Sequence, residues 1–588
     1  MIMKTKHYII ACIIVLFVLS FAWAGDTTVV YANQLNHYYR FGGVNRFSVE
    51  FGKVHVYNSI SNTSSIYSET SRLKTQTDIK ADILYAFLPQ FRFGLTGKYF
   101  LFQNGQTYHA YDYDQGRLGL KGDYRKNNYI FVLENGFAEE TRLGIRDMGW
   151  YGGLELGRNG SGLLFYPELN WDYSQMGERQ NYTFNNKISF RINKKSRVKN
   201  IFTAGLRAYN RKYYVSREAD TEERLNIMTY LQNDLYYPLS KHITVDYKFG
   251  FTSSNDGLSF SYYDEKETRN RQFLTLGNDV RVHAKSGAFK GYVGFANDYK
   301  QSRITATNID ISLPSDYIFN KNNLLARLSW RISERDSIHV NYLSSLLYYD
   351  TPDTNNYDDR DELSYSVSPM WNHRIDKYTN MSLGGNLFLH HYVYLYHQHS
   401  AQNHWNRVFS IRSEVNTHIP GRVNWTSKQE LYANYFVYDH EDSVFVHVQS
   451  MVFRGLKLQQ NIQYFFTPTV YLRAYMFLRF EDNGLLDWEN FIQEITDSKY
   501  TIKCELTPGF KRKKWNIAAG PVFSYRKDYR YTDLDTRTES YHSLRLGGLI
   551  SLQLSNKLTL HYRLEQIEQL GASRVYNQSG SLRFNMIF

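Results

Sequence analysis

The sequence predicts an all-β protein: a single large transmembrane antiparallel up-and-down β-barrel of about 26 strands, within a range of roughly 22–28. Apolar and polar residues alternate with a period of two along most of the chain, which gives each strand one apolar and one polar face. The same hairpin unit recurs to the last residue, and no helical segment is expected to cover the apolar faces. Aromatic residues make up 16% of the 588 residues, with 51 tyrosines, yet the mean hydropathy is −0.52. That combination fits a barrel better than helical membrane spans.

The N-terminus predicts a signal peptide over residues 1–24. Lys4 and Lys6 form a short positive region, residues 8–21 are apolar, and Ala22 to Ala24 form a small-x-small cleavage site. An uncleaved membrane anchor is the alternative. It is less favoured because the apolar segment is short for a membrane-spanning helix.

Residues 25–44 show no clear period, so we expect a short N-terminal leader there, followed by the barrel over residues 45–588. Cleavage of the signal peptide would leave Cys504 as the single cysteine, which excludes an intramolecular disulfide. No linker, low-complexity tract or change of composition divides the chain, although its length would suggest several domains in a soluble protein.

The clearest hairpin runs from Thr77 to Phe102, with a tight turn at Pro89. Eleven further tight turns separate alternating strands, and twelve hairpins plus a first and a last strand give about 26 strands. These turns are residues 125–128, 158–161, 193–197, 238–242, 285–287, 333–337, 374–377, 420–422, 467–468, 511–514 and 555–557.

Longer polar segments join the strands at their other ends, and we expect them to be loops. In a separate loop, residues 484–496 have helical spacing and predict a short helix. The long segments are residues 211–226, 253–271, 298–323, 350–362 and 526–541.

The last strand carries Leu582, Phe584, Met586 and the terminal Phe588 on one face. This pattern resembles the C-terminal assembly signal of bacterial outer-membrane β-barrels, and the resemblance to that class extends over the chain after the signal peptide. It implies insertion by the barrel-assembly machinery into outer-membrane lipid and lipopolysaccharide, after export through the inner membrane. It also implies short periplasmic turns, long extracellular loops and a periplasmic position for the leader.

A barrel of this size would enclose a wide lumen. Barrels of ~16–18 strands already hold an aqueous channel, and ~22-stranded transporters are plugged. We therefore expect inward loops, a partner protein or a substrate in transit to fill the lumen. The leader at 25–44 is too short for a plug domain or for periplasmic repeats, so a bare barrel is expected.

Alternation predicts that eight charged residues face the lumen. An excess of inward positive charge would favour anionic solutes, whereas pairing with inward acids such as Asp82 and Glu481 would cancel that preference. The eight residues are Lys80, Asp82, Arg92, Lys98, Lys121, Arg473, Arg479 and Glu481.

Five of the 18 histidines lie between His390 and His404. His397 and His399 would share a strand face and are weak candidates for metal ligands, but no Cys, Asp or Glu lies between them to complete a site. The favoured alternative is a wet, aromatic-rich strand end, so no metal site and no cofactor are expected. The five histidines are His390, His391, His397, His399 and His404.

These patterns predict a channel or conduit that passes solute or polymer through a polar lumen. One alternative is a scaffold that sheaths a partner such as a multihaem cytochrome, because the chain is similar to the barrels of porin–cytochrome conduits in predicted size and in lacking a plug. Another is export of exopolysaccharide or protein. The chain has no CxxCH motif and no nucleophile elbow, phosphate loop or metalloprotease motif, so we expect a non-enzyme without haem. A periplasmic partner at the basic turns is a further alternative, and no nucleic-acid partner is expected.

Overall fold

The computed structural model describes residues 27–584 apart from short gaps, so the expected signal peptide and the last four residues lie outside the described residues. No helix among the described residues is long and apolar enough to cross a membrane. The gaps are residues 36–37, 68–71, 105–111, 159–164, 194–197, 217–219, 263–264, 307–315, 353–355, 441–448, 488–489, 513–514, 534–535, 555–557 and 570–574.

The described residues form 28 β-strands and one short 3₁₀ turn, η2 (Ser400–Gln402). The first fourteen strands are β1 (Thr27–Leu35), β2 (Tyr38–Phe51), β3 (Val54–Tyr67), β4 (Arg72–Leu88), β5 (Phe91–Asn104), β6 (Tyr113–Lys126), β7 (Tyr129–Arg142), β8 (Ile145–Arg158), β9 (Phe165–Met176), β10 (Arg179–Asn193), β11 (Lys199–Tyr214), β12 (Thr221–Pro238), β13 (Ile243–Tyr262) and β14 (Glu265–Ser286). The others are β15 (Phe289–Ala306), β16 (Tyr317–Arg331), β17 (Asp336–Asp350), β18 (Arg360–Arg374), β19 (Thr379–Tyr394), β20 (His404–Ile419), β21 (Val423–Tyr438), β22 (Met451–Phe465), β23 (Val470–Asp487), β24 (Ile492–Arg512), β25 (Trp515–Asp533), β26 (Thr536–Leu554), β27 (Leu558–Gln569) and β28 (Val575–Phe584).

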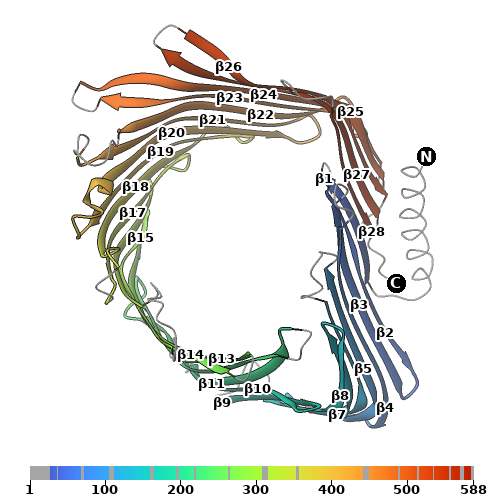
Figure 1. Ribbon diagram of the computed structural model, residues 1–588. Coiled ribbons are helices and arrows are strands. Elements are labelled where there is room, and N and C mark those ends of the chain that lie inside the picture. The colour runs from blue at the N-terminus through green and yellow to red at the C-terminus, as the bar shows by residue number, and fades with distance from the viewer. Residues whose placement is uncertain are drawn as a thin grey trace.

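Every strand pairs antiparallel with the next strand in the chain, from β1 to β28. The first and last strands also contact each other, so the strands form a ring around a central space (Figure 1). The prediction of an all-β, up-and-down antiparallel barrel is confirmed, with 28 strands instead of about 26.

One of the two additional strands, β1, lies in the segment predicted to be a leader, and the other, β3, follows β2 after residue 53. Residues 25–44 were expected to be a short leader, but β1 and the first part of β2 lie there, and a tight turn at Gly52-Lys53 joins β2 to β3 in a hairpin that the pattern did not reveal. In the pair formed by β1 and β2, Val29 lies opposite Val44 and Val30 opposite Gly43. Backbone hydrogen bonds join two strands whether or not their side chains alternate. Gly42 and Gly43 in β2 have no side chain and interrupt the apolar–polar alternation.

Strands also replace much of the predicted loop sequence. Residues 253–271 lie almost entirely in β13 and β14, which are 20 and 22 residues long, and Asp256 lies opposite Arg271 in their register. Only ~9–11 residues are needed to cross the hydrocarbon. Beyond the hydrocarbon both faces of a hairpin meet water. The hairpin residues there are polar on both faces, so their sequence resembles a loop although the strands are paired.

The short helix predicted over residues 484–496 is wrong. β23 extends to Asp487, β24 begins at Ile492, and the register shifts between Asn483 and Gly484. The ring of Phe491 lies 5.5 Å from that of Tyr435 on β21, outside its own hairpin. The apolar spacing that predicted the helix therefore includes an aromatic ring that contacts β21, not the face of a helix.

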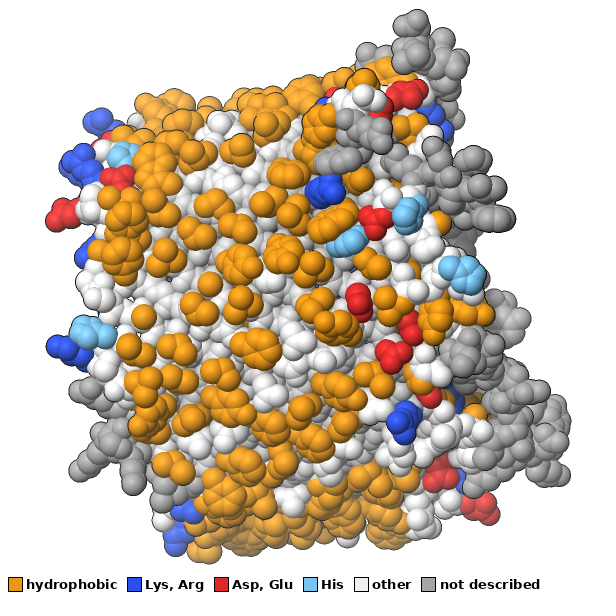
Figure 2. Space-filling view, turned by 90° about the vertical axis from the view of Figure 1, so that its left-hand side faces the viewer, with side chains coloured by type: hydrophobic (Ala, Val, Ile, Leu, Met, Phe, Trp, Pro, Cys, Tyr) orange, Lys and Arg blue, Asp and Glu red, His pale blue; other side chains and the backbone are white. Residues whose placement is uncertain are grey.

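The outer surface is an apolar band. Figure 2 shows hydrophobic side chains spread over the middle of one side of the barrel, with most charged side chains towards the two ends. The register builds this surface row by row, since Ile83 lies opposite Leu95 and Leu95 opposite Leu120, and each of the three is at least half exposed. A band of this kind suits contact with lipid.

Candidate functional site

The polar face of β4–β7 carries a connected network of charges. Thr96 donates a hydrogen bond to Asp82 (Oγ1 to Oδ1, 2.6 Å), and the Lys121 ammonium lies 2.9 Å from the other oxygen of Asp82. The Lys121 ammonium also lies 3.4 Å from the carboxylate of Glu134. The ammonium of Lys98 lies 2.5 Å from the other oxygen of that carboxylate. Asp82 and Lys121 are only 5% and 8% exposed, so each charge depends on its partners.

The eight predicted lumen residues fall into three groups. Lys98, Lys121 and Asp82 belong to the network just described, with Lys80 on the same face beside Lys98 in the register. Arg479 pairs with Glu481, whose carboxylate also accepts a hydrogen bond from Tyr432. Arg92 and Arg473 form no ion pair with any described residue.

Sequence reasoning missed Glu134 and a second network centred on Arg179. The Arg179 guanidinium is 2% exposed and lies 2.7 Å from Glu140 and 2.6 Å from Asp147, with its carbon 4.5 Å from the ring centre of Tyr214. The two acids lie directly opposite each other on β7 and β8. Alternation along β7 is the signal that puts Glu134 and Glu140 on one face, but their partners depend on the register.

The barrel wall bends sharply near β7 and β8, which form the corner at the lower right of Figure 1. Arg117 of β6 reaches Asp172 of β9 at 3.5 Å, although neither strand pairs with the other. Glycine permits the close approach of the backbones. A Cβ at Gly136 would lie 2.2 Å from the carbonyl oxygen of Leu118, and a Cβ at Gly149 would lie 1.6 Å from that of Gln175.

A polar recess of about 730 Å³ lies against this bend. β4, β5 and β6 supply one side, and β9, β10 and β11 supply the other. The Arg142 guanidinium of β7 lies over the ring of Tyr213 of β11, 4.3 Å from its centre, and joins the two sides.

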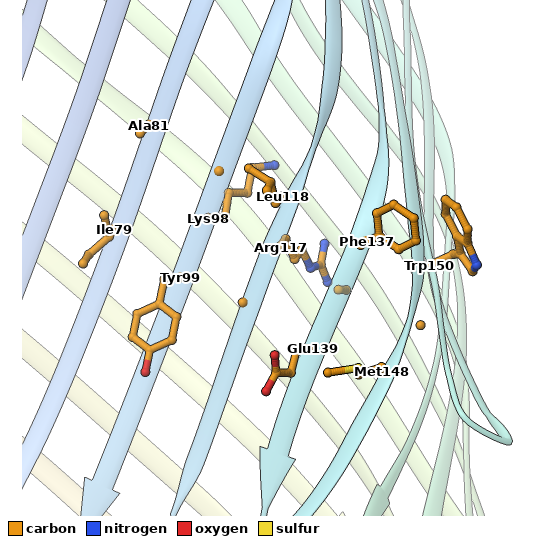
Figure 3. Close-up of a pocket in the computed structure, with 14 residues that line it drawn as sticks. Ile79, Ala81, Lys98, Tyr99, Arg117, Leu118, Phe137, Glu139, Met148 and Trp150 are labelled. Carbon is orange, nitrogen blue, oxygen red and sulfur yellow. The ribbon is translucent and has the colours of Figure 1, made fainter.

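A separate groove of about 780 Å³ shows a different chemistry (Figure 3). It is lined mainly by apolar side chains, including Tyr99, Leu118 and the close ring pair of Phe137 and Trp150, whose centres are 3.9 Å apart. These four side chains are all exposed, as expected of side chains in the apolar band that would meet lipid.

The histidine cluster is divided among different partners. His391 lies 2.8 Å from Asp439, and His390 lies 3.3 Å from Glu362. The ring of His404 lies 4.1 Å from that of Phe436. Among the described residues no group of three His, Cys, Asp or Glu side chains could hold a metal ion, and His397 and His399 form no such group.

The predicted assembly signal falls partly outside the described residues. Leu582 and Phe584 belong to β28, opposite Leu560 and Leu558 of β27, whereas Met586 and Phe588 lie beyond it.

A ring of antiparallel strands with an apolar outer band defines the class: the chain is a large β-barrel of the bacterial outer-membrane type. No protein-family model matches the chain, and no curated protein matches its sequence. Among solved structures it is similar to the copper transporter OprC, with 9% identity over 74% of this chain and 78% of that one and a TM-score of 0.40.

Two further structures are similar at the same level. The alcaligin outer-membrane receptor FauA from Bordetella pertussis shares 9% identity over 81% of each chain, with a TM-score of 0.38. The ferric citrate transporter FecA in its unliganded form shares 9% identity over 95% of this chain and 78% of that one, with a TM-score of 0.34. Likeness at this level carries no argument about substrate.

Proposed function

We propose that this chain is an outer-membrane channel or conduit that passes solute or polymer through a polar lumen, without catalysis of its own. The observation that carries the proposal is a ring of 28 strands with one apolar face and one face of interacting charges. Such a ring is wider than the ~16–18-stranded barrels that already hold aqueous channels.

The predicted lumen residues give this pathway its chemistry. In the proposal, Lys80, Asp82, Arg92, Lys98 and Lys121 line one wall, and Arg473, Arg479 and Glu481 line another. Ion pairing of Lys98, Lys121 and Arg479 supports a lumen with weaker charge selectivity than a count of its cations suggests. Hydrogen-bonded polar side chains would replace part of the hydration of a passing solute.

The width of the ring also favours a lumen-filling partner as a second candidate. A barrel of 28 strands that stayed open would leak solutes, so a scaffold that sheaths a partner protein fits the same geometry. The expected partners are then outer-membrane lipid and lipopolysaccharide outside and a protein inside.

Planar-bilayer recording of the purified, refolded chain tests the channel. We expect large steady conductance, and a bilayer that stays silent after confirmed insertion would contradict an open channel. Capture of a stoichiometric partner from native membranes, together with a silent bilayer, would favour the sheath. The matched control is the same preparation unfolded by heat, which must give no steps.

A further inference from the structure

We propose that the recess at the bend between β6 and β9 binds a small hydroxylated organic anion, such as an acidic sugar, on the lumen wall. This inference rests on the proposed function, because the recess reaches solvent through the lumen. It adds a solute class and a place on the wall to that proposal.

The lining has an excess of positive charge. Six cationic residues line the recess against three acids, an excess of three positive charges. The cations are Lys80, Lys98, Arg117, Arg142, Arg211 and Lys212.

Two of the three acids are already engaged, and the third, Asp78, is outnumbered by the cations without an ion pair to a described residue. Glu140 lies 2.7 Å from the guanidinium of Arg179, and Asp172 lies 3.5 Å from Arg117. By contrast, Arg142 and Arg211 form no ion pair with any described residue, and both instead lie over tyrosine rings. Free cationic groups are therefore left for a ligand.

Buried donors inside the recess also lack partners. The Nε–H groups of Arg117 and Arg142 are buried and have no hydrogen-bond partner among the described residues. A buried donor without a partner is costly, and an anionic oxygen would satisfy it. Two such arginines on the neighbouring strands β6 and β7 of one recess point to a ligand with a carboxylate or phosphate group.

The rest of the lining suits a ligand with hydroxyl groups. Gln115, Ser174, Asn181 and Thr183 add amide and hydroxyl groups to the lining. The volume of about 730 Å³ lies within the range of ~300–1,000 Å³ that is typical of small-molecule sites. A single inorganic anion would leave most of that space unfilled.

Glucuronate and glucose form a matched pair of probes that differ chiefly in charge. We would titrate each against the full-length barrel in neutral detergent and follow binding by saturation-transfer NMR. We expect saturable binding of glucuronate that weakens as salt screens the cations, and no saturable binding of glucose over the same range. Equal binding of both sugars, or of neither, would overturn the proposal.

Substitution of Arg142 and Arg211, the two arginines of the lining without an ion pair to a described residue, locates the site. Arg142→Gln with Arg211→Gln should raise the Kd for glucuronate at least tenfold, whereas Arg412→Gln on β20, across the ring, should leave it unchanged. Arg142→Lys keeps the charge and should retain most of the binding. Heat-modifiable migration on a gel reports whether each variant is a folded barrel, and unchanged affinity in a folded double variant contradicts the assignment.

Binding and conductance separate the two proposals. Specific glucuronate binding with a silent bilayer supports the recess and overturns the open channel. Steady conductance without glucuronate binding retains the channel and overturns the recess.

Discussion

At the scale of single residues, the buried network of Asp82, Lys121 and Glu134 couples three strands by charge. Replacement of Lys121 by methionine leaves Asp82 buried without its cation, whereas Glu134 keeps Lys98. Removal of one partner of a buried ion pair costs ~3–5 kcal/mol. We expect Lys121→Met to lower the free energy of unfolding by about that amount, measured by urea titration in lipid vesicles.

Two further variants test the cause of that loss. Lys80→Met removes a cation from the same face that has no ion pair with a described residue, so its effect should be much smaller. Asp82→Asn combined with Lys121→Met should recover part of the loss, because the uncompensated charge is gone. An equal loss in all three variants would show that side-chain packing, not charge, is responsible.

Asp376 lies in the tight turn between β18 and β19, outside the spanning strands. Its carboxylate accepts hydrogen bonds from the backbone N–H of Tyr378 at 2.6 Å and of Thr379 at 2.7 Å, and these bonds lower its pKa. A lowered pKa in the folded state stabilises the fold above the pKa of the unfolded chain, and this contribution is lost as the pH falls through the folded value.

The consequence is a pH-dependent difference between the wild type and Asp376→Asn. We expect the wild type to have the higher urea midpoint at pH 7. The difference should shrink below about pH 4, near the ordinary aspartate value. Asp78, which forms no hydrogen bond through its side chain with any described residue, provides the control substitution. A difference that is constant with pH would contradict the role of the ionised carboxylate.

Alternation alone predicted which residues share the polar face, but not how their charges pair. Lys98 and Glu134 are 36 positions apart and meet across β6, so their contact depends on the register of two hairpins. The recess is harder still to predict from the sequence, because Arg117 and Asp172 lie on strands that do not pair and meet only where the wall bends.

At the scale of strands, tyrosine rings cover glycines on neighbouring strands. A Cβ at Gly205 would lie 2.3 Å from Cζ of Tyr230, its partner in the register, and Gly509 has the same relation to Tyr471. Gly455 and Tyr432 form a third pair at 2.5 Å. The ring fills the space that glycine leaves, and it fixes the register by shape.

We expect Gly205→Ala to destabilise the barrel by ~1–3 kcal/mol, because Tyr230 must leave its position. Gly250→Ala on β13 is the matched control, since a Cβ there meets no atom within 4 Å. The measurement is the urea midpoint in vesicles. If Tyr230→Ala fails to relieve the effect of Gly205→Ala in the double variant, the ring is not the cause.

The predicted tight turns that lie among the described residues fall at one end of the barrel, where polar residues interrupt two alternating runs. Residues 159–161, 194–197, 513–514 and 555–557 of the other predicted turns lie outside the described residues. Tight turns at Leu143-Gly144 and Gly177-Glu178, at the other end, were missed, and both contain residues with positive φ. Single-residue conformations of that kind leave only a glycine as their mark in the sequence.

At the scale of the whole molecule, closure joins β1 to β28 over more than 500 residues. No local pattern can predict such a contact, and the width of the lumen depends on it. Paired cysteines test it directly. In a Cys504→Ser background, one cysteine at Val29, Val30, Tyr31 or Ala32 of β1 would be combined with one at Val575, Tyr576, Asn577 or Gln578 of β28.

A disulfide needs Cα atoms ~4.4–6.8 Å apart, so only neighbouring strands can form one. We expect at least one of these pairs to cross-link on mild oxidation of the folded barrel and to change its mobility on a gel. Pairs between β1 and Val280 or Val282 of β14 should not cross-link, because β14 pairs only with β13 and β15. Absence of every β1–β28 cross-link, with β1–β2 pairs as positive controls, would mean that the ring is open and that the lumen is not a sealed conduit.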